Sequence, residues 1–206
     1  MRVDRPPPGE ELNHGEVTEP RQAATLVLLR ESPEGPEVLL VQRNPKQRFM
    51  GGVWVFPGGA VHSSDADHAA AAVRELEEEA GIDLPEAAAI VPWTRWITPA
   101  EVKVRFDTRF FVAEAPPGAE ATADGSECLD ARWLRPAAAL EAHERGELML
   151  VFPTIKHLEA LAEFDTVVRA LDNARRSEVV PVQPKVTVRE GSAEVLMPGD
   201  PGFDEA

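Results

Sequence analysis

Three glutamates in one short segment could bind a divalent cation. The segment reads Arg74-Glu75-Leu76-Glu77-Glu78-Glu79-Ala80-Gly81-Ile82. Residues three and four apart lie on the same side of a helix, so Glu75, Glu78 and Glu79 would share one side. Each like-charged pair at that spacing costs about 0.2–0.5 kcal/mol. Mg²⁺ or Mn²⁺, which prefer carboxylate oxygens, would neutralise the cluster, and Arg74 can orient Glu78 by pairing with it.

The alternative is that these glutamates form only the solvated side of an amphipathic helix, whose other side carries Ala, Val and Leu. Taken alone, the segment favours this alternative. The residues just before it favour the metal site, because Phe56-Pro57-Gly58-Gly59 is a tight turn that would bring backbone carbonyls close to the carboxylates. A carboxylate that no metal occupies could then accept a proton as a general base.

The elements that must position this cluster alternate between strands and helices. A helix is predicted from about Asp67 to Ala80, with Gly81 as its C-terminal stop. Apolar runs predict strands at residues 23–29, 38–41, 53–56, 90–97 and 102–112, and around Trp133-Leu134. Pro136 opens a helix over residues 137–145. The spacing of Ile155, Leu158, Leu161, Phe164, Val168 and Leu171 predicts one long helix after Pro153. A hairpin is predicted over residues 186–197 around Glu190-Gly191-Ser192, and this order is that of a mixed α/β domain.

Composition limits the classes of partner. The chain has 206 residues, with 36 Asp and Glu against 21 Lys and Arg, which gives a net charge of −15. This charge disfavours nucleic acid and anionic membranes as partners. Residues 1–20 lack the apolar core of a signal peptide, so a cytoplasmic protein with a small partner is expected. The single cysteine, Cys128, and the dispersed histidines indicate neither a disulfide framework nor a zinc site.

The glutamate segment resembles the second half of the Nudix box, which reads Arg-Glu, an aliphatic, any residue, Glu-Glu, any residue, Gly and an aliphatic. The first half departs from the box: Asp65 replaces a glutamate, and eight residues rather than seven separate it from Arg74. The resemblance implies a Nudix-fold α/β/α sandwich with a mixed sheet and a phosphoanhydride hydrolase activity that uses Mg²⁺ or Mn²⁺. The metal ligands that it implies are Glu75, Glu78, Glu79 and the backbone carbonyl of Gly59. Arg74 would orient the glutamates, and Glu127, six residues before Trp133, would be a further metal ligand or base.

A second resemblance concerns the substrate. Arg43, Arg48, Gly52 and the Phe-Pro-Gly-Gly turn are in register with a motif of coenzyme A diphosphatases, although Val41 and Asn44 depart from it. Segments 96–99 and 105–111 are similar to a pattern of the peroxisomal members of that branch. The resemblance implies that Arg43 and Arg48 meet the 3′-phosphate of coenzyme A. Further substrate contacts would come from Trp96, Arg105 and Arg109. For each of these residues a structural role is the alternative.

The resulting hypothesis divides the chain into a flexible tail (residues 1–20), a Nudix hydrolase domain (21–176) and a C-terminal extension of helix and hairpin (177–206). Its expected substrate is coenzyme A or an acyl-coenzyme A, cleaved to 3′,5′-ADP and 4′-phosphopantetheine or its acyl derivative. Other nucleoside diphosphate derivatives, such as ADP-ribose, NADH or a nucleotide sugar, are the enzymatic alternative. A non-catalytic domain that senses a nucleotide is the alternative of another class. A homodimer is compatible with each of them.

Overall fold

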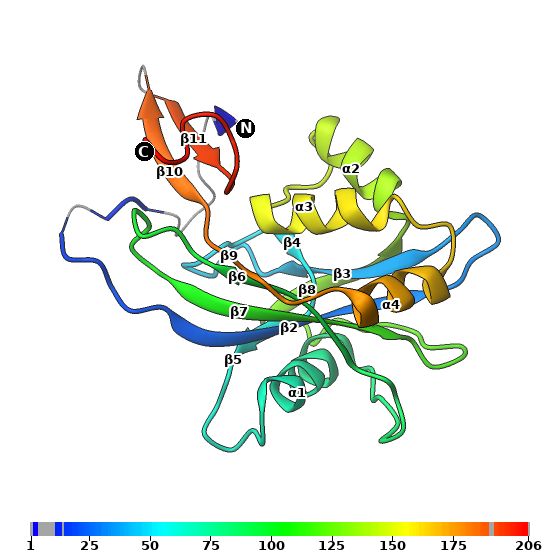
Figure 1. Cartoon of the computed structure of the whole chain (residues 1–206). Helices are drawn as coiled ribbons and strands as arrows, with labels where there is room; N and C mark the ends of the chain where they lie inside the picture. Colours follow the sequence, from blue (N-terminus) through cyan, green and yellow to red (C-terminus); the bar gives the residue numbers. More distant parts are fainter. Residues whose placement is uncertain (1, 4–10, 14, 190–191, 206) are drawn as a thin grey trace.

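The computed structural model describes residues 2–3, 11–13, 15–189 and 192–205, and a mixed sheet runs through its centre (Figure 1). The strands of this sheet are β2 (Arg21–Arg30), β3 (Glu37–Arg43), β4 (Trp54–Val55), β5 (Gly58–Ala60), β6 (Val91–Ile97), β7 (Phe106–Glu114), β8 (Cys128–Leu134) and β9 (Pro181–Val182). Their order is β4-β3-β2-β7-β6-β9, while β5 pairs with β2 and β8 pairs with β3.

The central strands β2 and β7 run parallel, in register from Arg21 opposite Phe106 to Leu29 opposite Glu114. Parallel strands covered on both faces are apolar along their whole length, and residues 26–29 are indeed fully buried. The neighbouring pairs β2–β3 and β6–β7 are antiparallel. Strand β7 begins at Phe106, later than the predicted 102, because Val102 instead forms an isolated bridge with Leu12.

Helix α1 (His68–Ala80) covers one face of the sheet, close to the predicted range. The Asp67 side chain caps its N-terminus by accepting a hydrogen bond from the backbone NH of Ala70 at 2.9 Å. Gly81 ends the helix with a φ of 66°, in the left-handed region that glycine adopts without strain. The buried side of α1, including Leu76, packs on residues of β2, β3 and β7.

Three helices cover the opposite face: α2 (Pro136–Glu144), α3 (Phe152–Leu161) and α4 (Val167–Arg176). Figure 1 shows the sheet between α1 on one side and α2 and α3 on the other. The buried side chains of the three helices form a second core with the sheet residues that point away from α1. The predicted α/β/α sandwich with a mixed sheet is therefore confirmed. Among the described residues, no helix is long and apolar enough to cross a membrane.

The single long helix predicted after Pro153 is wrong, because the chain forms α3 and α4 instead. Helix α3 ends at Leu161, and Phe164 lies in the connection. Thr166 starts α4 by accepting a hydrogen bond from the backbone NH of Arg169 at 3.3 Å. Val168 is 56% exposed and thus not on the buried side of α4. The apolar spacing continues across the break, so periodicity could not reveal it.

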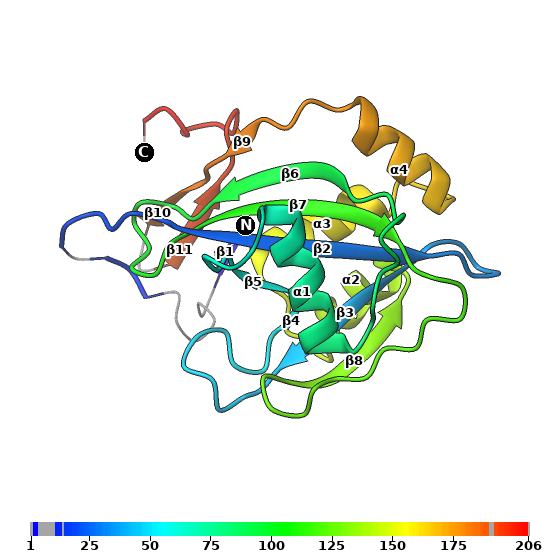
Figure 2. The same ribbon diagram turned by 90° about the horizontal axis from the view of Figure 1, so that it is seen from below.

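A second, three-stranded sheet joins the two ends of the chain. It consists of β1 (Arg2–Val3), β10 (Lys185–Arg189) and β11 (Ser192–Leu196) in the order β1-β11-β10, and we call it the terminal sheet. The predicted hairpin is present as β10 and β11, although Glu190-Gly191 of its turn lies outside the described residues. Figure 2 shows this sheet at one end of the central sheet, on the same side of the molecule as β9. Within residues 1–20, the described parts include β1, paired with β11, and Leu12, bridged to Val102.

Candidate active site

The glutamates of α1 differ in their surroundings. Glu75 and Glu79, one turn apart, are only 8% and 3% exposed and face β5. The Glu78 side chain is 57% exposed and lies at the edge of the cluster. Gly58 and Gly59, predicted as part of a tight turn, lie in strand β5 because they pair with β2. A Cβ on Gly59 would lie 2.5 Å from Oε1 of Glu75, so the backbone of β5 lies directly against this carboxylate. Gly58 donates its backbone NH to Oε2 of Glu79 at 3.0 Å.

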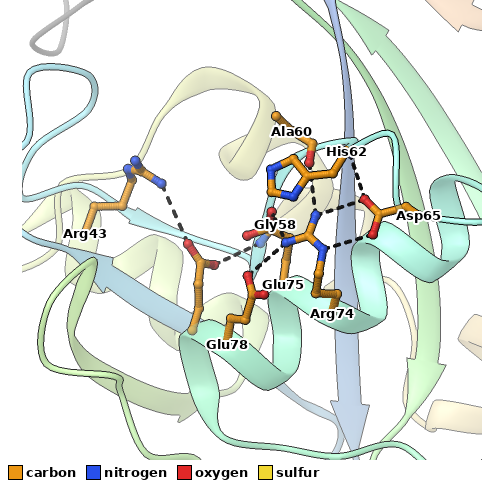
Figure 3. A network of polar contacts seen from close by, with 9 residues as sticks. Arg43, Gly58, Ala60, His62, Asp65, Arg74, Glu75 and Glu78 are labelled. Atoms are coloured by element: carbon orange, nitrogen blue, oxygen red, sulfur yellow. Dashed lines mark hydrogen bonds and ion pairs between the residues drawn. The ribbon is translucent and has the colours of Figure 1, made fainter.

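Arg74 connects this cluster to the loop before α1 (Figure 3). Its Nη1 donates to Oε1 of Glu75 at 2.9 Å and to Oε2 of Glu78 at 2.8 Å. Its Nε and Nη2 each donate to Asp65 at 3.0 Å, and Nη2 also donates to the Ala60 carbonyl at 3.1 Å. The guanidinium is thus fully engaged by protein groups, which fits the predicted role of Arg74 in orienting the glutamates.

Asp65 stands where the Nudix box has a glutamate, and the sequence alone did not show whether it contributes to the site. In the structure it does, through Arg74. Its hydrogen bonds from Arg74 and from the backbone NH of His62 lower its pKa to about 2. The carboxylate remains ionised at neutral pH and anchors Arg74 in a two-pronged ion pair. Asp65 is shorter than the glutamate of the Nudix box, and its spacer to Arg74 is one residue longer. The ion pair with Arg74 forms despite both differences.

Burial raises the pKa of Glu75, and it raises the pKa of Glu79 to about 7, with the neighbouring Glu75 adding to the rise. The nearest cation to Glu79 is Arg43, whose Nη1 lies 3.8 Å from its Oε1. The Cys128 thiol is fully buried beside Glu79. Buried carboxylates crowded in this way are unfavourable without positive charge, and they are typical of functional sites.

A cavity of about 690 Å³ opens beside the cluster. Of the predicted site residues, those that line it are Arg43, Gly59, Arg74, Glu75, Glu78, Glu79, Trp96 and Glu127. Three predicted substrate contacts, Arg48, Arg105 and Arg109, do not line it. The structure thus brings the whole predicted metal set to one end of the cavity, which we call the carboxylate end, but only two of the five predicted substrate contacts.

Arg105, predicted to contact the substrate, lies outside the cavity lining and is held by backbone carbonyls. It is 8% exposed and donates to the carbonyls of Thr98 at 3.1 Å and Thr18 at 2.6 Å. Arg109 is exposed on β7 and belongs to the sheet face that α1 covers, because the residues on either side of it, Thr108 and Phe110, point into the cavity. Arg48 is exposed on the loop between β3 and β4.

Trp96 and Glu127 lie on different parts of the cavity. Trp96 is 9% exposed and packs against the rings of Phe152 and His157, so it forms part of the floor. Glu127 is exposed on the loop before β8, and its backbone NH donates to Oδ2 of Asp124 at 2.9 Å.

Asp124, which the sequence did not single out, organises the loop that carries Glu127. Its carboxylate also accepts from the hydroxyl of Ser126 and from the backbone NH groups of Ser126 and Cys128. Desolvation alone would raise the pKa of Asp124, but these hydrogen bonds lower it to about 2. Asn44 fixes the loop to the end of β3 by donating to the carbonyls of Ser126 and Glu127. The sequence contained a signal for this role, because an aspartate in a loop with Gly and Ser often accepts hydrogen bonds from the backbone NH groups that follow it.

The donor set fits a hard divalent cation, since it consists of carboxylate oxygens and a closely approaching glycine backbone. Within the described ranges, no group of three acidic, His or Cys side chains is arranged to hold a metal ion. Arg74 engages one oxygen of Glu75 and one oxygen of Glu78, which leaves the second oxygen of each carboxylate outside these ion pairs.

Comparison with known proteins places this site in context. The NUDIX domain model matches residues 19–151. An uncharacterized Nudix hydrolase, NudL of Klebsiella aerogenes, is 45% identical over 78 residues, which is 38% of this chain and 63% of that protein. The putative nudix hydrolase 7 of Caenorhabditis elegans is 25% identical over 225 residues, covering 90% of this chain and 76% of that protein. The chain thus spans less than two thirds of the length of the NudL relative.

Solved structures agree with the fold. A NUDIX hydrolase from Alicyclobacillus acidocaldarius has a TM-score of 0.71 and 28% identity, over 78% of this chain and 99% of that chain. The NUDIX domain of Shewanella oneidensis NrtR, solved with ADP ribose, has a TM-score of 0.56 at 19% identity, over 71% of this chain and 88% of that chain. This second likeness concerns the fold alone.

Proposed function

Because the NUDIX domain model matches more than half of the chain, at residues 19–151, the chain belongs to the Nudix hydrolase family. On this premise we propose that it hydrolyses the diphosphate of a nucleoside diphosphate derivative, and that the first candidate is coenzyme A or an acyl-coenzyme A. The observation that carries the proposal is the pair of buried carboxylates, Glu75 and Glu79, at the end of a cavity that is large enough for such a ligand.

Each residue of the carboxylate end has a part in this reaction. Glu75, Glu78, Glu79 and the Gly59 backbone would hold Mg²⁺ or Mn²⁺. When bound, such an ion neutralises the diphosphate, lowers the pKa of bound water and stabilises the leaving phosphate oxygen. Arg74 holds Glu75 and Glu78 against the loop through Asp65, so it orients the glutamates without contacting substrate.

Glu127 is the carboxylate best suited to accept the proton of the attacking water. It is exposed at the cavity, and no hydrogen bond of its side chain to another described residue competes for it. The loop that carries it is fixed by Asp124 and Asn44, so its backbone is held in place. A general base needs this combination of access and a defined position.

The preference for coenzyme A rests on the cations at the end of β3 and in the loop that follows it. Arg43 lines the cavity, and its Nη2 donates to Oε1 of Gln47 at 2.8 Å. Lys46 and Arg48 are exposed on the same loop, next to Phe49 and Met50, which line the cavity. A phosphate at the rim of the cavity would thus meet Lys46 and Arg48, two cations of a protein whose net charge is −15.

A substrate panel tests the proposal. Coenzyme A, 3′-dephospho-coenzyme A, ADP-ribose, NADH and a nucleotide sugar would be incubated with Mg²⁺ or Mn²⁺ and the products separated by chromatography. We expect coenzyme A to yield 3′,5′-ADP with the highest kcat/KM, and Arg48→Ala to weaken coenzyme A more than its dephosphorylated form. Turnover of ADP-ribose without coenzyme A would refute the substrate choice only. Binding of a nucleotide without any turnover would favour the sensor alternative.

A further inference from the structure

Besides the glutamates, the cavity is lined by a set of apolar side chains. Six of its lining side chains are Phe49, Met50, Ile97, Phe106, Val186 and Val195, which we call the apolar wall. Hydrocarbon groups placed against such a surface are stabilised by leaving water. The cavity therefore offers both charged and apolar surface to a ligand.

The terminal sheet contributes Val186 and Val195 to this wall. These valines are directly opposite each other on the antiparallel strands β10 and β11, and opposite residues on neighbouring strands point to the same face of a sheet. Both lie outside residues 19–151, the part of the chain that matches the NUDIX domain. The wall thus combines residues of the NUDIX domain with residues that lie beyond the match to it.

Contacts on several sides hold the terminal sheet against the cavity. The backbone NH of Val186 donates to Oε2 of Glu101 at 3.2 Å. Just before β10, strand β9 pairs with β6, with Val182 opposite Trp96. Leu196 of β11 is only 6% exposed. These contacts make the terminal sheet a fixed part of the cavity.

We propose that the terminal sheet belongs to the substrate-binding site, and that the pair Val186–Val195 selects diphosphates whose far end carries an apolar chain. The inference rests on the proposed function, because it takes the diphosphate to lie at the carboxylate end. A nucleoside base is a poorer occupant of the wall, since its polar edges need hydrogen-bonding partners that six apolar side chains do not offer. A hydrocarbon chain needs none.

The test compares coenzyme A with its decanoyl thioester in steady-state kinetics. We expect Val186→Asp to raise the ratio of KM for the decanoyl thioester to KM for coenzyme A by about tenfold or more. Val180→Asp is the matched control, because Val180 is 61% exposed and does not line the cavity. It should change neither KM. Equal losses for both compounds, or no loss for the thioester, would overturn the inference.

A binding measurement separates this inference from the proposed function. Calorimetry in the presence of a chelator would compare the affinity of both compounds for the wild type and for Val186→Asp, with no turnover required. A selective loss of affinity for the thioester supports the inference even if no diphosphate is hydrolysed. If circular dichroism shows that Val186→Asp does not fold, Val186→Thr decides the question. It keeps the shape of valine, and an unchanged preference for the thioester would refute a role for this side chain.

Discussion

Acidification is expected to destabilise this protein through His157, which lies beneath the cavity. His157 is 2% exposed, and its Nδ1 is 2.7 Å from the Pro153 carbonyl, which can only accept a hydrogen bond. Nδ1 therefore carries the proton, and Nε2 accepts from the Thr94 hydroxyl at 2.6 Å. The ring of Phe110 stacks on the imidazole at 4.2 Å. Burial lowers the pKa of His157 from 6.5 to about 4, against the opposing effect of the Pro153 carbonyl.

The sign and size of the effect follow from linkage. The unfolded chain binds a proton at His157 below about pH 6.5, whereas the folded protein does so only near pH 4. The stability that neutral His157 provides is therefore complete above pH 6.5 and is lost as the pH falls from there toward 4. Between about pH 7.5 and about pH 4.5, the free energy of unfolding should fall by about 2.5 kcal/mol from this residue alone.

Urea unfolding of the wild type and His157→Gln at both pH values measures this contribution. Glutamine retains a donor and an acceptor but does not titrate, so the variant reports the pH dependence of all other groups. We expect the wild type to lose about 2.5 kcal/mol more than the variant on acidification, whatever the stability of the variant at neutral pH. An equal loss in both proteins would refute the assignment of a depressed pKa to His157.

Gly59→Ala should lower kcat/KM by about 100-fold, because the new Cβ would lie 2.5 Å from Oε1 of Glu75 and displace that carboxylate. Asp65→Asn should lower kcat by about 10- to 100-fold by weakening the pair that positions Arg74. Since the pKa of Asp65 is about 2, the ratio of wild-type to variant rates should not vary with pH near neutrality. Glu78→Gln should abolish turnover and leave the thermal unfolding temperature nearly unchanged, because its side chain is 57% exposed.

Matched controls separate these effects from general damage. Gly15→Ala introduces a methyl group at an exposed glycine whose nearest neighbour would be 3.8 Å away, and it should not change kcat/KM. Glu77→Gln removes a charge from the exposed side of α1, outside the cavity lining, and should leave turnover intact. If Glu77→Gln and Glu78→Gln reduce turnover equally, the site has been assigned to the wrong glutamates.

Local sequence patterns predicted most of the central fold. Helix α1 could be placed because its apolar side repeats at helical spacing and Gly81 marks its end. Patterns failed where a distant contact decides. The apolar spacing runs on across the break between α3 and α4, where the backbone NH of Val167 donates to Oε1 of the distant Glu31 at 2.7 Å.

The site shows the same division between local and distant information. The glutamates could be identified because helical spacing alone brings them together. The surroundings of Arg105 and Arg109 could not be predicted in this way. They depend on strand register, which decides the sheet face on which a residue lies and the carbonyls that it contacts. The contribution of Val186 and Val195 to the cavity depends on the pairing of β9 with β6, just before β10, which no local pattern records.

The pairing of β1 with β11 has a kinetic consequence. Arg2 lies opposite Glu194, so this contact joins residues separated by almost the full length of the chain. Contacts of such high sequence separation close the largest loop and form slowly. During synthesis β11 also leaves the ribosome after every element of the central sheet. We therefore expect the carboxylate end to form first, and a competent binding cavity to exist only after the last folding step.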